Sequence, residues 1–128
     1  MVQSKKCRVL FVEDEALVAM LIEDMLLELG IEVVGPASKI ETALELARDA
    51  EVEAAVLDIN VGGVLTFPVA DVLAERGVPV IFATGYGSSV LPERFRRTQT
   101  LQKPFDQVQF GKALQSVLTD SPCEIEAV

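Results

Sequence analysis

Residues 8–14 read RVLFVED, a short apolar run that ends abruptly on two carboxylates. The same pattern returns at residues 54–58 (AAVLD) and 79–84 (PVIFAT), where an apolar run again ends on a polar side chain. Apolar runs that lack alternating polar residues are typical of strands buried on both faces, as in a parallel sheet covered by helices. The three runs therefore predict central strands of an α/β domain.

Helical segments alternate with these strands. Residues 16–29 form a long apolar-rich stretch that stops at Gly30, a residue suited to the positive φ of a helix C-terminus. Thr66 is expected to cap the helix that follows the strand at 54–58. Further strands are expected at 31–34 and 98–102, and further helices at 40–47, 88–94 and 106–117, the last one capped by Asp106 and Gln109. Five strands in strict alternation with helices, joined by right-handed crossovers, predict a doubly wound parallel sheet.

Composition limits the possible functions. The chain has 128 residues, half of them apolar, which predicts one domain with a packed core. Eleven basic and 20 acidic residues give a net charge of −9, so binding to nucleic acid by phosphate neutralisation is not expected. The chain contains no histidine, which excludes histidine-based triads and a phosphohistidine donor within it. The first apolar run is too short for a signal peptide or a membrane span, so we expect a cytoplasmic protein.

Two predictions concern the ends of the chain. The only cysteines, Cys7 and Cys123, lie far apart in the sequence, and we expect both to be reduced thiols. Residues 1–120 are expected to form the domain, whereas residues 121–128 show no periodicity and are expected to be a frayed tail. We expect a monomer or a weak dimer.

Polar residues at the ends of the predicted strands form the candidate site. Ligands of open parallel sheets bind at the carboxyl edge, where the strand order reverses, and this edge would bring Glu13, Asp14 and Asp58 together. Three carboxylates repel one another unless a cation lies among them, and Mg²⁺ prefers such oxygen ligands. Thr84 and Lys103 would add a hydroxyl donor and a positive charge. This set of groups suits phosphoryl transfer to a carboxylate.

The order of these motifs resembles the receiver domain of two-component response regulators over essentially the whole chain. The pattern consists of Glu13-Asp14, then Asp58 after an apolar strand, then Thr84-Gly85, and finally Lys103-Pro104-Phe105. Each motif alone has an ordinary explanation, such as acidic residues beside a helix N-terminus or a turn after a strand. Together they imply a flavodoxin-like (βα)5 sandwich with a parallel sheet in the order 2-1-3-4-5.

The resemblance also implies a role for each site residue. Asp58 would accept a phosphoryl group from a phosphohistidine of a sensor histidine kinase. Mg²⁺ would be held by Asp14 directly, by Glu13 mainly through a water molecule, by Asp58, and by the backbone carbonyl of Asn60. Thr84, Gly85 and Lys103 would bind the phosphoryl oxygens, and the Lys103–Pro104 peptide would be cis.

Two features depart from the general pattern. Receivers usually carry an aromatic switch residue three positions before the lysine, and here that position is Thr100. Residues 82–87 read FATGYG, which matches the motif of the receiver subclass called FATGUY. Its members are typically single-domain regulators paired with HWE-type histidine kinases. Tyr86, two residues after Thr84, lies where receivers tune access of water and partners.

The sequence therefore predicts a stand-alone response regulator, which signals by protein contact or drains phosphate from a shared kinase and is not an enzyme in the ordinary sense. One alternative is a pseudo-receiver that binds partners without phosphorylation. A second is an aspartate-based phosphohydrolase, but such enzymes usually carry a second catalytic aspartate two residues after the first. That position is Asn60 in this chain.

Overall fold

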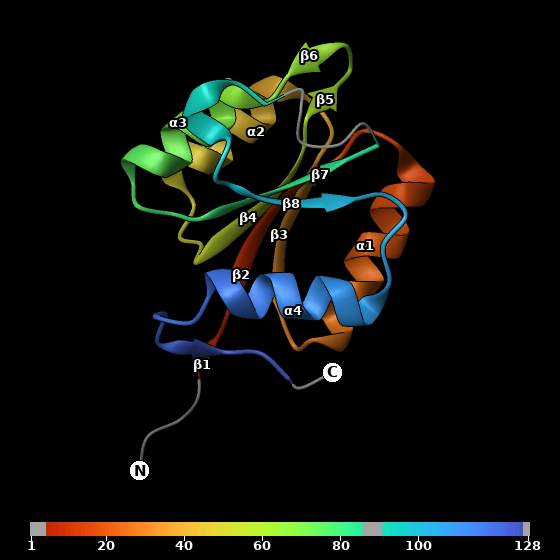
Figure 1. The fold of residues 1–128 in the computed structure, drawn as a ribbon, viewed down its shortest axis with the longest axis vertical. Helices are drawn as coiled ribbons and strands as arrows, with labels where there is room; N and C mark the ends of the chain where they lie inside the picture. Colours follow the sequence, from red (N-terminus) through yellow and green to blue (C-terminus); the bar gives the residue numbers. More distant parts are fainter. Residues whose placement is uncertain (1–4, 86–90, 127–128) are drawn as a thin grey trace.

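Five parallel strands form the central sheet of the computed structural model, which describes residues 5–85 and 91–126 (Figure 1). The sheet order is β3-β2-β4-β7-β8. The strands are β2 (Arg8–Val12), β3 (Glu32–Ala37), β4 (Ala54–Asp58), β7 (Val80–Thr84) and β8 (Gln99–Gln102). Counted along the chain within this sheet, the order is 2-1-3-4-5, which confirms the predicted topology.

Helices cover both faces of the sheet. Figure 1 shows α2 (Ile40–Asp49) and α3 (Phe67–Glu75) on one face, and α1 (Ala16–Glu28) and α4 (Gln107–Val117) on the other. Alternation along β2 divides the core into two clusters, because Val9 and Phe11 pack toward α1 and α4 whereas Leu10 packs toward α2 and α3. Gly30 follows α1 with φ of 73°, as expected for a helix end. None of the helices in the described part of the chain has the length and apolar composition that crossing a bilayer requires.

The segment between β7 and β8 differs from the helix predicted at 88–94. Residues 88–90 lie outside the described part, and the remainder contains only a short 3-10 turn, η2 (Glu93–Phe95). The Arg94 guanidinium holds this turn against α3 through two hydrogen bonds to Asp71, of 2.9 and 3.0 Å. Phe95 packs edge-on against Phe82, with ring centroids 5.5 Å apart. A bidentate ion pair and an aromatic contact thus fix this segment without a regular α-helix.

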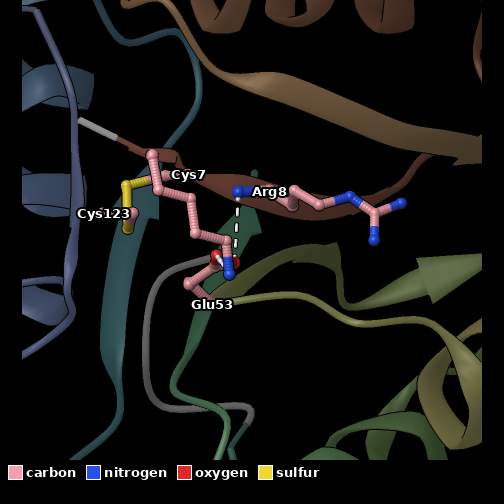
Figure 2. The surroundings of a disulfide bond; sticks show 5 residues. Cys7, Arg8, Glu53 and Cys123 are labelled. Atoms are coloured by element: carbon pink, nitrogen blue, oxygen red, sulfur yellow. Dashed lines mark hydrogen bonds and ion pairs between the residues drawn. A yellow bond between two sulfur atoms is a disulfide. The ribbon is translucent and has the colours of Figure 1, made fainter. Parts of the chain in front are cut away.

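The ends of the chain differ from the sequence prediction. Cys7 and Cys123 form a disulfide bond, so the prediction of two reduced thiols is wrong for this structure (Figure 2). The reason is topological: β1 (Lys5–Lys6) pairs in parallel with β9 (Cys123–Glu124), and this pairing brings the two Cα atoms to 4.9 Å. That separation lies within the range for disulfides.

The predicted frayed tail is likewise replaced by ordered structure up to residue 126. The β9 strand is followed by Ile125, which packs against the core, and by Glu126, whose N–H donates to the carbonyl of Leu29. Beside the disulfide, the carboxylate of Glu53 accepts the N–H of Arg8 (Figure 2). The same carboxylate lies 3.2 Å from the ammonium of Lys5. Periodicity could not predict this order, because the strand pairing, the disulfide and the Glu126 hydrogen bond all join the segment to residues more than ninety positions away.

We expect reduction of the disulfide to lower the free energy of unfolding by about 2–5 kcal/mol, because the bond closes a loop with a sequence separation of 116 residues. Urea denaturation of the wild type, with and without a thiol reductant, measures the effect. The double variant Cys7→Ser, Cys123→Ser is the control, since the reductant should leave its midpoint unchanged. A wild-type midpoint that does not move, while thiol titration counts two free thiols, would contradict the prediction.

Candidate functional site

The carboxyl ends of the central strands carry the candidate site. Glu13 and Asp14 follow β2, Asp58 is the last residue of β4, and Lys103 follows β8. The parallel register places Asp58 opposite Ala83 of β7, and it places Thr84 opposite Gln102 of β8. The sheet therefore brings together residues that are up to 90 positions apart, as expected for parallel strands.

Three carboxylates form a tight cluster at this edge. One oxygen from each of Glu13, Asp14 and Asp58 lies within 4.8 Å of the others. Glu13 is buried, Asp58 is half-buried and Asp14 is exposed, so the cluster opens to solvent on one side. Oxygen ligands at such spacing, partly open to water, are suited to a hard divalent cation such as Mg²⁺.

Lys103 supplies the positive charge within the cluster. Its ammonium donates a hydrogen bond of 2.6 Å to Glu13 and lies 3.4 Å from the carboxylate of Asp58. Burial lowers the pKa of Lys103, but the hydrogen bond to Glu13 and the charges of Asp58 and Glu13 outweigh it and raise the pKa. Lys103 is therefore protonated at neutral pH. One ammonium cannot balance three ionised carboxylates, and this leaves charge for a bound metal to neutralise.

The pKa of the Asp58 carboxyl is shifted by its surroundings. Burial is the main cause that raises its pKa, the positive charge of Lys103 opposes it, and Glu13 raises it further, to about 6. The proton is thus held far more tightly than by an ordinary aspartate, whose pKa is 3.8. A carboxylate destabilised by neighbours and burial favours cation binding, because a cation stabilises the ionised form.

A short hairpin after Asp58 reaches over the cluster. It consists of β5 (Asn60–Val61) and β6 (Val64–Leu65), and its turn residues Gly62 and Gly63 have φ of 59° and 82°. The Gly62 N–H donates a 2.8 Å hydrogen bond to Asp14, while the Asn60 side chain accepts the N–H of Gly63. Glycines permit a turn with two positive φ values, and this turn carries the hairpin to a predicted metal ligand.

The remaining predicted residues lie as follows. Thr84 is buried at the end of β7, and its carbonyl accepts the N–H of Lys103 at 2.8 Å. Gly85 is exposed, with open space around the position of a Cβ. The Lys103–Pro104 peptide is cis. Thr100 is half-buried in β8 opposite Phe82, and Tyr86 lies outside the described residues.

An apolar groove adjoins the cluster. It has a volume of about 340 Å³ and is lined by Val18, Leu21, Ile22, Met25, Lys103, Pro104 and Phe105. Its α1 wall continues into exposed apolar side chains, with Leu17 and Met20 exposed by 77% and 61%. Exposed apolar side chains next to a polar site favour contact with another protein.

The sequence matches the response regulator receiver domain over residues 9–115, and the chain therefore belongs to that family. A solution structure of SdrG from Sphingomonas melonis Fr1 is 41% identical, with a TM-score of 0.80. The match covers 91% of this chain and 99% of that one. The BeF3-activated conformation of SdrG, from Pseudomonas melonis Fr1, matches with a TM-score of 0.74 over 87% of this chain and 95% of that one, again at 41% identity.

Two further matches are weaker: one covers only half of the relative, and the other has a low sequence identity. The transcriptional regulatory protein PdtaR of Mycobacterium tuberculosis is 33% identical over 102 residues, which is 77% of this chain. The chain spans half the length of that relative. The receiver domain of the sensor histidine kinase PA1611 from Pseudomonas aeruginosa PAO1, solved with magnesium coordinated in its active-site cleft, matches with a TM-score of 0.74. Its identity of 21%, over 91% of this chain and all of that one, shows a shared fold.

Sequence reasoning missed two contributors to the site. The N–H of Gly62 is a backbone group, and only the Gly62-Gly63 pair hinted at a hairpin turn that presents it. Thr66 was predicted as a helix cap, but its side chain makes no cap bond and instead donates to the backbone carbonyl of Asp58. That contact depends on how the loop after Asp58 closes, which residue types alone do not specify.

The raised pKa of Asp58 predicts how stability varies with pH in metal-free buffer. Because the folded protein binds this proton more tightly than the unfolded chain, ionising Asp58 costs folding free energy as the pH rises from about 4 through about 6. Asp58→Asn removes this cost. We therefore expect the stability of the variant relative to the wild type to increase between pH 4 and pH 7.

Urea denaturation across this pH range measures the difference, and NMR titration of the Asp58 carboxyl carbon should give a midpoint near 6. Asp120→Asn, at an exposed position after α4, is the control for a change of charge alone. If the difference in the free energy of unfolding between Asp58→Asn and the wild type stays constant from pH 4 to 7, the assigned pKa is contradicted.

Proposed function

We propose that this chain is a response regulator whose Asp58 accepts a phosphoryl group from a histidine kinase in a Mg²⁺-dependent reaction. The observation that carries the proposal is the position of Asp58, which shares one cluster with two further carboxylates and lies 3.4 Å from the ammonium of Lys103. Membership of the receiver family supports the same role. The chain would then be a signalling protein that is itself modified.

The residues present fit the chemistry of this transfer. A carboxylate oxygen of Asp58 forms a bond to phosphorus while the phosphorus–nitrogen bond of phosphohistidine breaks. The imidazole leaves with the bonding electrons and takes up a proton from solvent. Mg²⁺ would be held by Asp14, Asp58, the Asn60 carbonyl and, through water, Glu13, and would neutralise the charge of the phosphoryl oxygens. The Lys103 ammonium and the Thr84–Gly85 segment would receive those oxygens.

The apolar groove beside Lys103 is the proposed docking site for the kinase. A phosphohistidine must approach Asp58 from the open side of the cluster, where the exposed residues of α1 begin. The FATGYG motif at residues 82–87 favours an HWE-type histidine kinase as the partner. In this arrangement the histidine-bearing helices would pack on Leu17, Met20 and Leu21, which are exposed although apolar.

We further propose that the receiver domain itself carries the output of this protein. The SdrG chain supports this, because 99% of its length is covered by the match to this receiver. Output would then come by contact with another protein or by withdrawal of phosphate from a shared kinase. The cytoplasm is the compartment in which such a kinase would be met.

Incubation with acetyl phosphate and Mg²⁺ is expected to add one phosphoryl group per chain, visible as a single mass increase in intact mass spectrometry. Asp58→Asn should abolish labelling, because the nucleophilic oxygen pair is lost. Asp14→Asn should raise the Mg²⁺ concentration needed for half-maximal labelling by about tenfold or more, because loss of a group that only supports a metal ligand already weakens binding by about 10–100-fold. Asp120→Asn is the matched control and should be labelled like the wild type.

Two outcomes would reject the proposal in different directions. A folded wild-type chain that neither binds Mg²⁺ nor becomes labelled would favour the pseudo-receiver alternative. Steady hydrolysis of added phosphomonoesters, with many turnovers per chain, would favour the phosphohydrolase alternative.

A charged side chain placed in the groove should impair docking of the kinase without impairing the phosphorylation chemistry at Asp58. We expect Leu21→Glu to slow phosphotransfer from a histidine kinase by about tenfold or more, because it places a charge in an apolar contact. Labelling by acetyl phosphate should remain unchanged. The kinase used is one found to label the wild type in a screen of purified histidine kinases.

Leu27→Glu is the matched control, since Leu27 is similarly exposed on α1 but does not line the groove. Equal rates of transfer from the kinase to the wild type and to Leu21→Glu would rule out the groove as the docking site.

A further inference from the structure

Thr66 occupies the N-cap position of α3 but does not behave as a cap. The side chain is fully buried and makes no hydrogen bond to the first turn of the helix. Threonine at this position ordinarily accepts such a bond, which stabilises a helix by about 1 kcal/mol. The hydroxyl is therefore used elsewhere.

The hydroxyl points back to the end of β4. It donates to the carbonyl of Asp58 at 2.6 Å, and the carbonyl of Ile59 lies 3.2 Å away. The Thr66 N–H donates to the same Ile59 carbonyl at 2.8 Å. One residue thus holds two successive carbonyls, beginning with that of the phosphoacceptor itself.

These bonds close the loop that carries the β5–β6 hairpin. The base of the loop is held by Thr66, and its tip is held by the Gly62 N–H on Asp14. Asn60, whose carbonyl is the proposed third protein ligand of the metal, lies between the two attachments. A shift at the base would therefore move Asn60 and the backbone of Asp58 relative to Asp14.

We propose that Thr66 is a positioning residue for the metal and phosphoryl site, acting through the carbonyl of Asp58. This inference rests on the proposed function, because it concerns how the site holds Mg²⁺ before transfer. The hydroxyl fixes the distance between the Asp58 backbone and the hairpin, and the metal ligands on either side of Ile59 are thereby held in place before the cation binds.

The matched pair Thr66→Val and Thr66→Ser tests this role. Valine keeps the shape of threonine and removes the hydroxyl, whereas serine keeps the hydroxyl and removes the methyl group. Loss of one buried hydrogen bond should weaken Mg²⁺ binding about three- to tenfold in Thr66→Val. Thr66→Ser should bind Mg²⁺ like the wild type, even though its smaller side chain leaves a gap in the core.

Two readouts follow Mg²⁺ binding. The first is a titration of the apo protein, followed by the NMR signal of the Gly62 amide. The second is the Mg²⁺ concentration that gives half-maximal labelling by acetyl phosphate. Urea denaturation provides stability for comparison. Thr119→Val is the control at the far end of the molecule, since the Thr119 hydroxyl also donates to a backbone carbonyl, that of Gln115, at 2.9 Å.

The outcomes are distinct. If the Mg²⁺ affinity follows the presence of the hydroxyl and not the stability of the variants, the positioning role holds. If Thr66→Val binds Mg²⁺ as tightly as the wild type, Thr66 is only structural and the inference is overturned. Should Thr66→Val fail to fold, Thr66→Ser against Thr66→Ala isolates the same hydroxyl, and equal affinities in that pair would overturn it too. A wild type that binds no Mg²⁺ rejects the proposed function instead.

Discussion

A buried carboxylate at the end of β2 constrains the whole carboxyl edge of this sheet. Glu13 is 2% exposed, and a charge so far from water requires a close cation. Lys103 supplies this cation. It follows the end of β8, which β4 and β7 separate from β2, and its ammonium lies 2.6 Å from the Glu13 carboxylate. The ion pair between Glu13 and Lys103 therefore depends on the register of the four strands β2, β4, β7 and β8. Because Lys103 also faces Asp58, the contact that compensates Glu13 places a positive charge beside the proposed phosphoacceptor.

The fold was predictable because apolar runs of a few residues in the sequence determine how the strands are buried in the sheet. Apolar runs such as 9–12 and 54–57 favour burial on both faces, and a parallel sheet covered by helices provides that burial. The Asp106–Gln109 capping box was also predictable, since both partners lie within one helical turn and the structure contains both bonds. The carboxylate cluster followed from the same logic, because parallel strands deliver their last residues to one edge.

Three features could not be predicted, and all three depend on contacts between distant or backbone groups. The disulfide needs the pairing of β1 with β9, and neither segment has enough residues to show a strand pattern. The contact of Gly62 with Asp14 uses a main-chain N–H, which residue identity does not reveal. Thr66 was assigned to the right element but the wrong partner. Local propensity ranks threonine as a cap, whereas the returning loop offers its hydroxyl a closer acceptor.

The two ends of the sheet differ in how they are held together. At the amino end, the disulfide and the pairing of β1 with β9 tie the start of the chain to its last described residues. At the carboxyl end, unlike charges are held close together and one side remains open to solvent. If, as proposed, the site gains and loses a doubly charged ion and a phosphoryl group, it must tolerate large changes in charge. Under the proposed function, the loops around Asp58 would take up these changes, and the Thr66 and Gly62 hydrogen bonds would limit how far the chain moves there.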